Sequence, residues 1–288
     1  MQEFEPVLAV AREAALAGGA AAVAGAADLQ YLSWKGPRDA VVGRALHIQQ
    51  VIVDRIRHTY PDDAILCEEG PDDEPLPIDA DPLWIVDPTC GSTNYLQHDP
   101  HYAVCVGYRL AGFWQVGVVY EAARGDLYSG VRGGRAELNG QVLNVQQFGD
   151  GTEAIERAVV GMDWPASDDA RRDMGIVINV LSSQVLGLRS LGSPALGVCS
   201  VAAGRSHGYV ALGLKLWDLA PASVVLQAAG GIVTDSFGGS WMHSNDGSCL
   251  ASNATIHGRL ITSFGPLNAL RRLAAARAAA GGDQGDAR

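Results

Sequence analysis

Carboxylates stand where short apolar runs of the chain end or where a helix is predicted to begin. Asp87 follows the apolar run 83–86, Glu68 and Glu69 follow a similar run, and Asp218 stands at the start of a predicted helix. A hard cation such as Mg²⁺ binds carboxylate oxygens together with phosphate oxygens and water. If the ends of these elements meet, they form a divalent-cation site built from three acidic segments.

A turn-forming segment follows Asp87 and reads P-T-C-G-S-T-N from residue 88 to residue 94. Gly91 allows the backbone to turn sharply, and Ser92 and Thr93 favour the start of a helix. Backbone N–H groups at such a turn form an anion site. The segment therefore indicates a protein that binds a phosphorylated molecule beside a metal ion.

Three motifs of the chain share their pattern with one enzyme family. The sequence C-E-E at 67–69 corresponds to G-E-E, the segment 84–95 to W-x-x-D-P-x-D-G-T-T-N-F, and the segment 217–231 to W-D-x-A-A…E-A-G-G. In these motifs, and over about residues 7–265, the chain resembles the inositol monophosphatase family, the lithium-sensitive, magnesium-dependent phosphatases related to fructose bisphosphatase. The resemblance implies an α/β fold of the α+β layered kind, the family's αβαβα sandwich, often as a homodimer.

The resemblance implies two metal positions. The first would use Glu68, Asp87 and the backbone carbonyl of Thr89, and all three are present. The second would use Asp87, Asp218 and a further aspartate, in whose place this chain has Cys90. A thiol is a soft ligand that suits zinc or other transition metals better than Mg²⁺. We therefore expect one Mg²⁺ site and a weak or empty second site.

The catalytic residues implied by the resemblance are only partly present. Ser92 stands where relatives have the threonine that activates water, but the aspartate that assists it is replaced by Ala45. The remaining candidates for acid, base or nucleophile are Glu68, Glu69 and Cys90, with the histidines 47, 98 and 101 as weaker alternatives. Ordinary hydrolysis by the family's route is not implied.

Substrate contacts differ in a similar way. By resemblance, phosphate and substrate would meet the residues Gly91, Ser92, Thr93, Ser193, Lys215 and Asp218. Ala211 replaces a glutamate that bonds a cyclitol hydroxyl in inositol-processing relatives. This argues against myo-inositol monophosphate. Arg44 and Lys215 add positive charge near the altered positions, and a fixed cation can hold phosphate oxygens.

Cys90 allows two interpretations. It precedes an anion-binding turn, a place that lowers the pKa of a thiol and favours a nucleophile or a ligand for a metal other than magnesium. Alternatively it is a tolerated substitution in a site that has lost its original role, and this interpretation is preferred.

Charge and composition exclude other classes of function. The net charge of −11 argues against a nucleic-acid surface. Five cysteines without C-x-x-C spacing favour a reducing compartment. The N-terminus lacks the basic region of a signal peptide, and no apolar run is expected to span a membrane. The chain is therefore expected to be cytoplasmic, with a small phosphorylated metabolite as its partner and neither nucleic acid nor membrane.

Periodicity predicts the elements that position these residues. Two helices are expected at about 7–29 and 45–60, a loop at 31–38, and antiparallel strands between 102 and 140. The strand 83–86 is expected to end at Asp87-Pro88, because proline removes the next ladder donor. After about residue 153, strands and helices alternate, which indicates an α/β layer.

The pattern and the resemblance imply a single unit at 1–276, with an antiparallel-sheet half at about 1–150 and an α/β half at about 151–276. Residues 277–288 are expected to form a disordered tail.

Three functions remain open from the sequence. The first is a phosphomonoesterase-like enzyme acting on a small phosphorylated sugar, cyclitol or nucleotide. The second is a repurposed enzyme, of lyase or cyclase type, that uses the same pocket. The third is a catalytically inactive homologue that binds a ligand.

Overall fold

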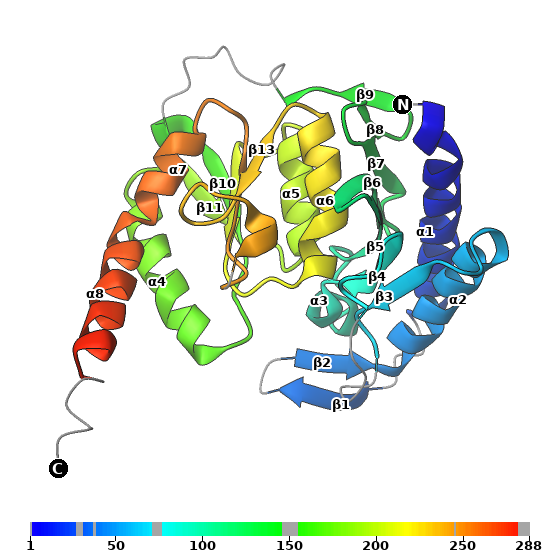
Figure 1. The fold of residues 1–288 in the computed structure, drawn as a ribbon, viewed down its shortest axis with the longest axis horizontal. Helices are drawn as coiled ribbons and strands as arrows, with labels where there is room; N and C mark the ends of the chain where they lie inside the picture. Colours follow the sequence, from blue (N-terminus) through cyan, green and yellow to red (C-terminus); the bar gives the residue numbers. More distant parts are fainter. Residues whose placement is uncertain are drawn as a thin grey trace.

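Two β-sheets lie face to face, with one helical layer between them and one on each outer side (Figure 1). The computed structural model describes residues 2–26, 31–36, 39–70, 77–145, 155–244 and 246–281. These layers form the αβαβα sandwich that the family resemblance implies. Its outer layers are α1 (Glu5–Gly25) with α2 (Gly43–Thr59), and α4 (Asp168–Ser182) with α7 (His257–Ser263) and α8 (Gly265–Gly281); its central layer is α5 (Pro194–Ala202) with α6 (Leu216–Ala228).

The first sheet has seven strands in the order β3-β4-β5-β6-β7-β8-β9. Only β3 and β4 run parallel, and each later neighbour is antiparallel, as the alternating pattern predicts. Ala111, Gly112, Asn139 and Gly140 have positive φ at the turns. The strands are β3 (Ala64–Cys67), β4 (Leu83–Cys90), β5 (Ala103–Leu110), β6 (Phe113–Glu121), β7 (Asp126–Val131), β8 (Ala136–Leu138) and β9 (Gln141–Leu143).

The second sheet has five strands in the order β11-β10-β12-β14-β13. The strand β10 is parallel to both of its neighbours, whereas β14 is antiparallel to both of its own. This mixed sheet confirms the predicted alternation of strands and helices. Its strands are β10 (Val159–Met162), β11 (Gly187–Arg189), β12 (Gly208–Ala211), β13 (Ile232–Thr234) and β14 (Cys249–Ser252).

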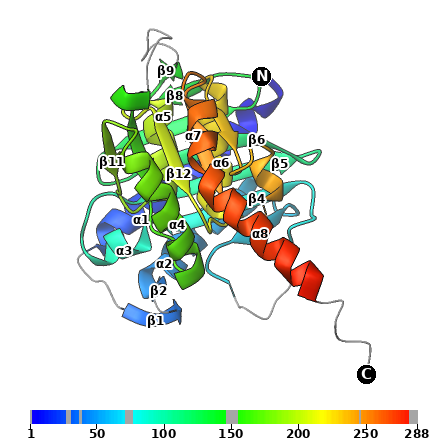
Figure 2. The ribbon, with the colours of Figure 1, turned by 90° about the vertical axis from the view of Figure 1, so that its left-hand side faces the viewer.

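The remaining elements are short. Residues 31–36, expected to belong to a loop, instead form the strand β1 (Tyr31–Gly36), which pairs antiparallel with β2 (Asp39–Val42). The helix α3 is Ser92–Leu96, and 3₁₀ turns lie at Gln2–Phe4, Ile155–Arg157 and Trp241–His243. Figure 2 shows α4, α7 and α8 over the outer face of the second sheet. Because α8 reaches Gly281, the helix continues beyond residue 276, where the tail was expected to begin; residues 282–288 lie outside the described part.

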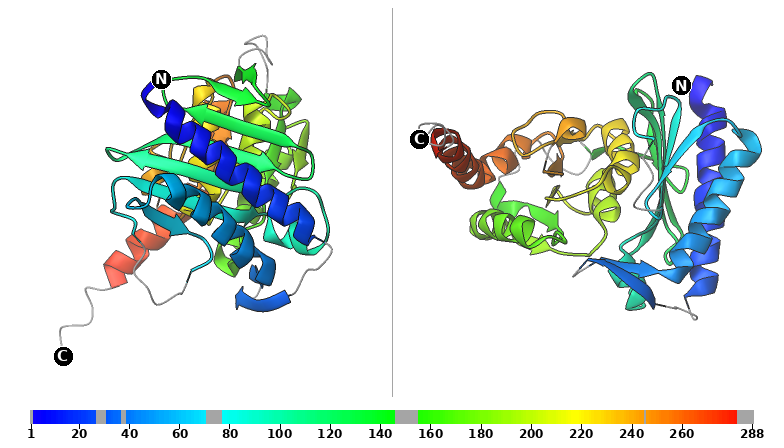
Figure 3. Two further views of the ribbon diagram at one scale, coloured as in Figure 1. Left: turned by 90° about the vertical axis from the view of Figure 1, so that its right-hand side faces the viewer. Right: turned by 60° about the horizontal axis from the view of Figure 1, so that its bottom comes forward.

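The helices α1 and α2 lie across the outer face of the first sheet (Figure 3). The predicted stripe of α2 is confirmed, since Ala45, Ile48, Ile52 and Ile56 are fully buried. Trp84 of β4 lies beneath these helices, with its ring centroid 4.9 Å from that of Tyr108. This packing anchors the strand that leads into the candidate site.

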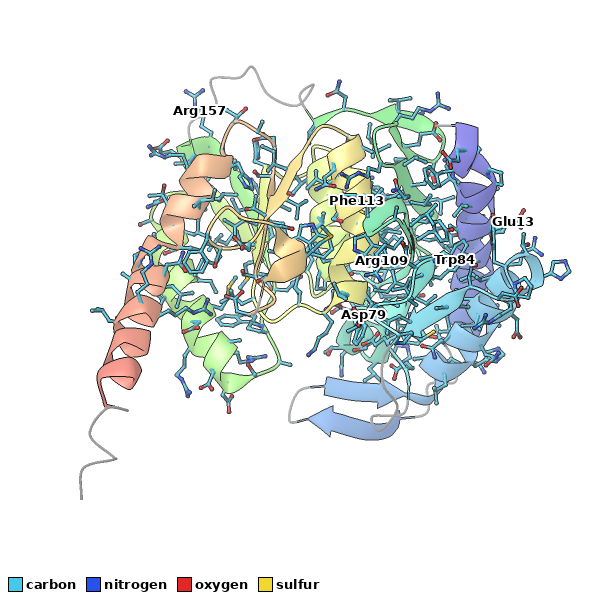
Figure 4. All side chains as sticks on the ribbon, in the orientation of Figure 1. Glu13, Asp79, Trp84, Arg109, Phe113 and Arg157 are labelled. Carbon is cyan, nitrogen blue, oxygen red and sulfur yellow. The ribbon has the colours of Figure 1, made fainter. Side chains whose placement is uncertain are left out.

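By length and composition α1 is apolar enough to cross a membrane, which corrects the expectation that no run reaches that length. Half of its apolar window is buried in the fold, where small residues such as Ala11, Ala14 and Ala15 pack on the sheet. Its outer side carries Glu13, which pairs with Arg55 of α2 (Figure 4). These contacts are those of a helix that packs on the sheet as part of the folded sandwich.

The strand β4 does not end at Asp87-Pro88 as predicted. It continues to Cys90, with an irregular register against β5 between Asp87 and Cys90. The partner on the other side, β3, pairs with β4 only as far as Val86. Proline is tolerated here because it lies at a bulge where one neighbour has already stopped pairing.

Glycine brings α6 unusually close to the first sheet. A Cβ on Gly117 of β6 would lie 2.0 Å from the carbonyl oxygen of Pro221 in α6. No side chain fits in that space, so α6 rests directly on the strand. This contact sets the position of Asp218 in the first turn of the same helix.

Candidate active site

A pocket of about 470 Å³ opens where β4 ends, between the two sheets. It is lined by residues from β4, the turn after it, the end of β12 and the start of α6. The structure therefore brings most of the predicted site residues together. Those that line the pocket are Glu68, Asp87, Thr89, Cys90, Gly91, Ser92, Thr93, Lys215 and Asp218.

Asp87 is fixed by its own strand. Its Oδ1 accepts a hydrogen bond from the backbone N–H of Thr89 at 3.0 Å. Its Oδ2 is buried and has no hydrogen-bond partner among the described residues, and the same holds for Thr89 Oγ1. Buried oxygens are normally paired, so an unpaired carboxylate oxygen in a pocket fits a cation ligand.

Asp218 reaches the pocket from the first turn of α6. Its Oδ2 accepts the backbone N–H of Lys215 at 2.7 Å, which satisfies a backbone donor at the start of the helix. The predicted place of Asp218 at a helix start is thus confirmed. This hydrogen bond fixes the direction of the carboxylate.

The electrostatics of the acidic group favour a cation. Burial raises the pKa of Glu68 and that of Asp87 well above the ordinary carboxyl range, and the charge of Asp218 raises both further. A positive ion between these groups would remove the cost of holding them ionised together. Glu68, Asp87 and Asp218 therefore have the ligand chemistry that suits Mg²⁺.

The turn after β4 has the geometry predicted for it. Gly91 has φ of +102° and precedes α3. A Cβ on Gly91 would lie 2.9 Å from the carbonyl oxygen of Gly192. The turn is therefore held against the loop that precedes α5, and Ser92 and Thr93 face the pocket from the first residues of α3.

Cys90 is a buried residue in the pocket wall. Its Sγ accepts hydrogen bonds from Ser193 Oγ at 3.5 Å and from the backbone N–H of Ala195 at 3.4 Å. The pKa of this thiol is raised, first by a hydrogen bond with Cys105 and then by burial. The expectation of a lowered pKa is wrong, because the thiol lies inside the core beside acidic groups rather than in the exposed turn.

Two predicted residues lie outside the pocket lining. Ser193 is fully buried and contacts the sulfur of Cys90. Glu69 is buried beyond the end of β3, where its backbone N–H donates to Gln49 Oε1 at 3.0 Å. Both residues are therefore buried next to residues that line the pocket, without lining it themselves.

The structure also places the residues that differ from the family motifs and the two cations proposed to compensate for them. Ala211, at the end of β12, lines the pocket, whereas Ala45 is fully buried in the first turn of α2 and does not. Arg44 does not line the pocket either, and its Nε is buried without a hydrogen-bond partner in the described ranges. Of the two proposed compensating cations, only Lys215 lies at the pocket.

Asp163 was not predicted as a site residue. It follows β10 directly, is 8% exposed, and lines the pocket with Trp164. Sequence reasoning assigned it to a polar loop. Its position after a predicted strand was the available signal, since the carboxyl ends of strands in such sheets form ligand sites.

A model of the inositol monophosphatase family matches residues 3–268. The chain belongs to the inositol monophosphatase family. The Nus factor SuhB of Pseudomonas aeruginosa is 32% identical over 268 residues, which cover 91% of this chain and 97% of the relative.

Solved structures of the family agree with the fold. The extragenic suppressor protein suhB of Bartonella henselae has a TM-score of 0.82 at 28% identity, covering 90% of this chain and 98% of that one. The inositol monophosphatase of Anabaena has a TM-score of 0.77 at 28% identity, covering 92% and 97%. Members of the inositol monophosphatase family bind small phosphorylated substrates and generally depend on Mg²⁺.

Proposed function

We propose that the chain is a phosphomonoesterase-like enzyme that acts on a small phosphorylated sugar, cyclitol or nucleotide. The observation that carries the proposal is the convergence of Glu68, Asp87 and Asp218 on one pocket, where Asp87 Oδ2 has no partner in the described part of the chain. Membership of the inositol monophosphatase family supports the same reaction class.

Glu68, Asp87 and the carbonyl of Thr89 would hold one Mg²⁺ ion. When bound, the ion neutralises charge on the phosphoryl group and lowers the pKa of a bound water. The second family position does not fit Mg²⁺, because Cys90 offers a buried sulfur where a carboxylate would be needed. We therefore propose a single magnesium position.

The chain's own groups bind and orient the phosphate. Backbone N–H groups of Gly91, Ser92 and Thr93 would bind phosphate oxygens, and Lys215, which also lines the pocket, would add positive charge. The hydroxyl of Ser92 would orient the attacking water. As the new P–O bond forms, the P–O bond to the substrate alcohol breaks, and the proton lost by water ends on the departing alkoxide. Because Ala45 can accept no proton, we expect slow hydrolysis, since losing a member of a catalytic unit costs orders of magnitude.

The pocket favours a substrate with a ring that offers an apolar face. Ala211 cannot accept a hydrogen bond from a cyclitol hydroxyl, and Trp164 is half-exposed at the rim. The guanidinium of Arg171 lies 5.6 Å from the centroid of the Trp164 ring and orients it. Such a surface fits a sugar or nucleoside better than a fully hydroxylated cyclitol.

Phosphate release from a panel of sugar, cyclitol and nucleotide monophosphates tests the proposal. Activity should require Mg²⁺, and Asp87→Asn or Asp218→Asn should reduce kcat/KM about a hundredfold or more. Asp169→Asn is the matched control, because that carboxylate is exposed on α4. Undiminished activity in both site variants would remove this pocket from consideration.

A binding protein without catalysis is the second candidate. Relatives from several bacteria are named Nus factor SuhB, so the expectation of no nucleic-acid partner lacks support. The losses at Ala45 and Cys90 favour this alternative, and they also keep a repurposed lyase or cyclase open. Tight binding of a phosphorylated ligand by calorimetry, without turnover, would support the binding role.

The chain is further proposed to be a cytoplasmic homodimer without membrane attachment. All five cysteines are free thiols, which suits a reducing compartment. Sedimentation analysis of the purified protein tests the dimer.

A further inference from the structure

Two thiols and a carboxylate gather at the pocket wall, where Asp87 and Cys90 line the pocket and Cys105 lies outside the lining. The ligand atoms of Asp87, Cys90 and Cys105 all lie within 4.8 Å of one another. All three residues are buried, with 1%, 2% and 0% of their surface exposed. Cys105 was not among the predicted site residues, so this cluster is larger than the one substituted motif position.

Strand pairing explains why the three side chains meet. Asp87 of β4 lies opposite Cys105 of β5, and Cys90 lies opposite Ala103. Directly opposed residues of an antiparallel pair share a face, and so do residues two apart on one strand. The irregular register between Asp87 and Cys90 places Cys90 on that same face.

The surroundings hold two of the three ligands in place. Cys90 Sγ accepts hydrogen bonds from Ser193 Oγ and from the N–H of Ala195, and such donors orient a sulfur ligand. Asp87 Oδ1 is bound to the Thr89 N–H, while Oδ2 is unpaired among the described residues. Asp87 therefore has an oxygen that no described N–H or hydroxyl group binds, although the neighbouring Glu68 carboxyl can share a proton with this group.

We propose that Asp87, Cys90 and Cys105 bind a transition-metal ion of the zinc class. Ligand sulfurs on a tetrahedral zinc ion lie about 3.8 Å apart for bonds of about 2.3 Å, which the cluster accommodates. On binding, each thiol gives up its proton to solvent and coordinates as thiolate. Mg²⁺ does not compete well for such a donor set, because it prefers oxygen.

Three protein ligands leave the ion a fourth position. Asp87 and Cys90 line the pocket, so this fourth position faces the proposed substrate site. Three protein ligands with one open place are typical of catalytic rather than structural zinc. This inference shares Asp87 and the pocket with the proposed function. It does not depend on catalysis, because the metal ion can bind without turnover.

Anaerobic Co²⁺ titration of the chelator-treated, fully reduced protein tests the site. Bound Co²⁺ should give a thiolate-to-metal charge-transfer band in the near ultraviolet that saturates at one ion per chain. Excess Mg²⁺ should leave the band in place, and Zn²⁺ should abolish it with release of Co²⁺. Cys90→Ser and Cys105→Ser should each weaken Co²⁺ binding by about 10- to 100-fold or more.

Cys249→Ser is the matched control, because Cys249 is an equally buried thiol on β14. It should keep the band unchanged. Thermal melts establish that each variant folds; if Cys90→Ser does not, Cys90→Asp replaces it and should reduce the band to the contribution of the one remaining thiolate.

Several results would overturn the proposal. These are no band in the wild type, a band that survives in both serine variants, equal loss in Cys249→Ser, or a Cys90–Cys105 disulfide found by mass in place of metal. A band without phosphate release leaves the metal site standing while the phosphatase proposal fails. Magnesium-dependent phosphate release without a Co²⁺ band would support the phosphatase proposal and overturn the metal site.

Discussion

Asp163, directly after β10, accepts the backbone N–H of Gly192 through Oδ1 at 2.7 Å. Its Oδ2 accepts the hydroxyl of Tyr209 at 2.9 Å. Gly192 precedes Ser193, which contacts the sulfur of Cys90. One buried carboxylate thus joins the second sheet to the strand of the first sheet that carries the candidate metal ligands.

Asp163→Ala should destabilise the protein by about 1–3 kcal/mol, because the buried Tyr209 hydroxyl and the partly buried Gly192 N–H and Ser190 hydroxyl lose their acceptor. Asp163→Asn should lose less, since an amide oxygen still accepts from Gly192. Urea denaturation measures both, with Asp169→Ala as the exposed control. Equal losses in the alanine and asparagine variants would contradict this role.

Glu121 should make stability depend on pH. It is buried at the end of β6, 3.6 Å from the Arg124 guanidinium, and burial raises its pKa. The folded-state pKa of Glu121 lies above the ordinary value of about 4.3. The contribution of Glu121 to the free energy of unfolding is therefore fully present below about pH 4.3. The contribution is lost as pH rises through the raised value.

Glu121→Gln should therefore cost less stability relative to the wild type at pH 8 than at pH 4.5. Paired urea denaturations of both proteins at the two pH values measure the difference. A cost that is larger at pH 8 would mean that Arg124 stabilises the ionised form enough to outweigh burial.

Cys90→Asp should strengthen Mg²⁺ binding at the second position and increase phosphate release about tenfold or more, because it supplies a hard ligand. Cys90→Asn is the matched control of similar size without the charge. Adding Ala45→Asp should give a gain greater than the product of the single effects. Because Ala45 is fully buried, melting temperatures must accompany the rates. Slower hydrolysis in Cys90→Asp would show that the thiol has its own catalytic role.

Hydrolysis of myo-inositol monophosphate should be very slow. Ala45 supplies no carboxylate for the water, and Ala211 supplies no acceptor for a substrate hydroxyl. A phosphate-release assay compares this substrate with sugar and nucleotide monophosphates. Rapid turnover would mean that other residues have taken over both roles.

Gly117→Ala should destabilise the fold by about 1–3 kcal/mol, since its methyl group would meet the carbonyl oxygen of Pro221. The shift of α6 should also weaken Mg²⁺ binding through Asp218. Gly175→Ala is the control, because this exposed helical glycine has no neighbour within 4 Å and should gain about 0.5–1 kcal/mol. A neutral Gly117 variant would show that α6 can move away freely.

Much of the fold follows from local patterns in the sequence. The buried stripe of α2 and the alternating strands of the first sheet repeat with the periods of helix and strand, so they are readable without tertiary information. Asp87 and Asp218 were identifiable because each follows or opens an element with recognisable ends.

The features that sequence reasoning missed depend on contacts between distant residues. Cys105 can be recognised as a candidate metal ligand only from the strand register, which sets it opposite Asp87. The continuation of β4 through Pro88 depends on where β3 stops pairing. Asp163 becomes part of the site because Gly192 and Tyr209 fold against it.

The order in which the chain is made bears on the central helical layer. The seven strands of the first sheet are complete at Leu143, whereas α5 and α6, which cover their inner face, end only at Ala202 and Ala228. During translation, these helices are made on the order of ten seconds after the sheet. Until then the inner-face residues Ile85, Val119 and Tyr128 are not covered by them. Nascent chains at this stage should need chaperone shielding, and products of premature termination before α6 should aggregate rather than persist as a soluble half.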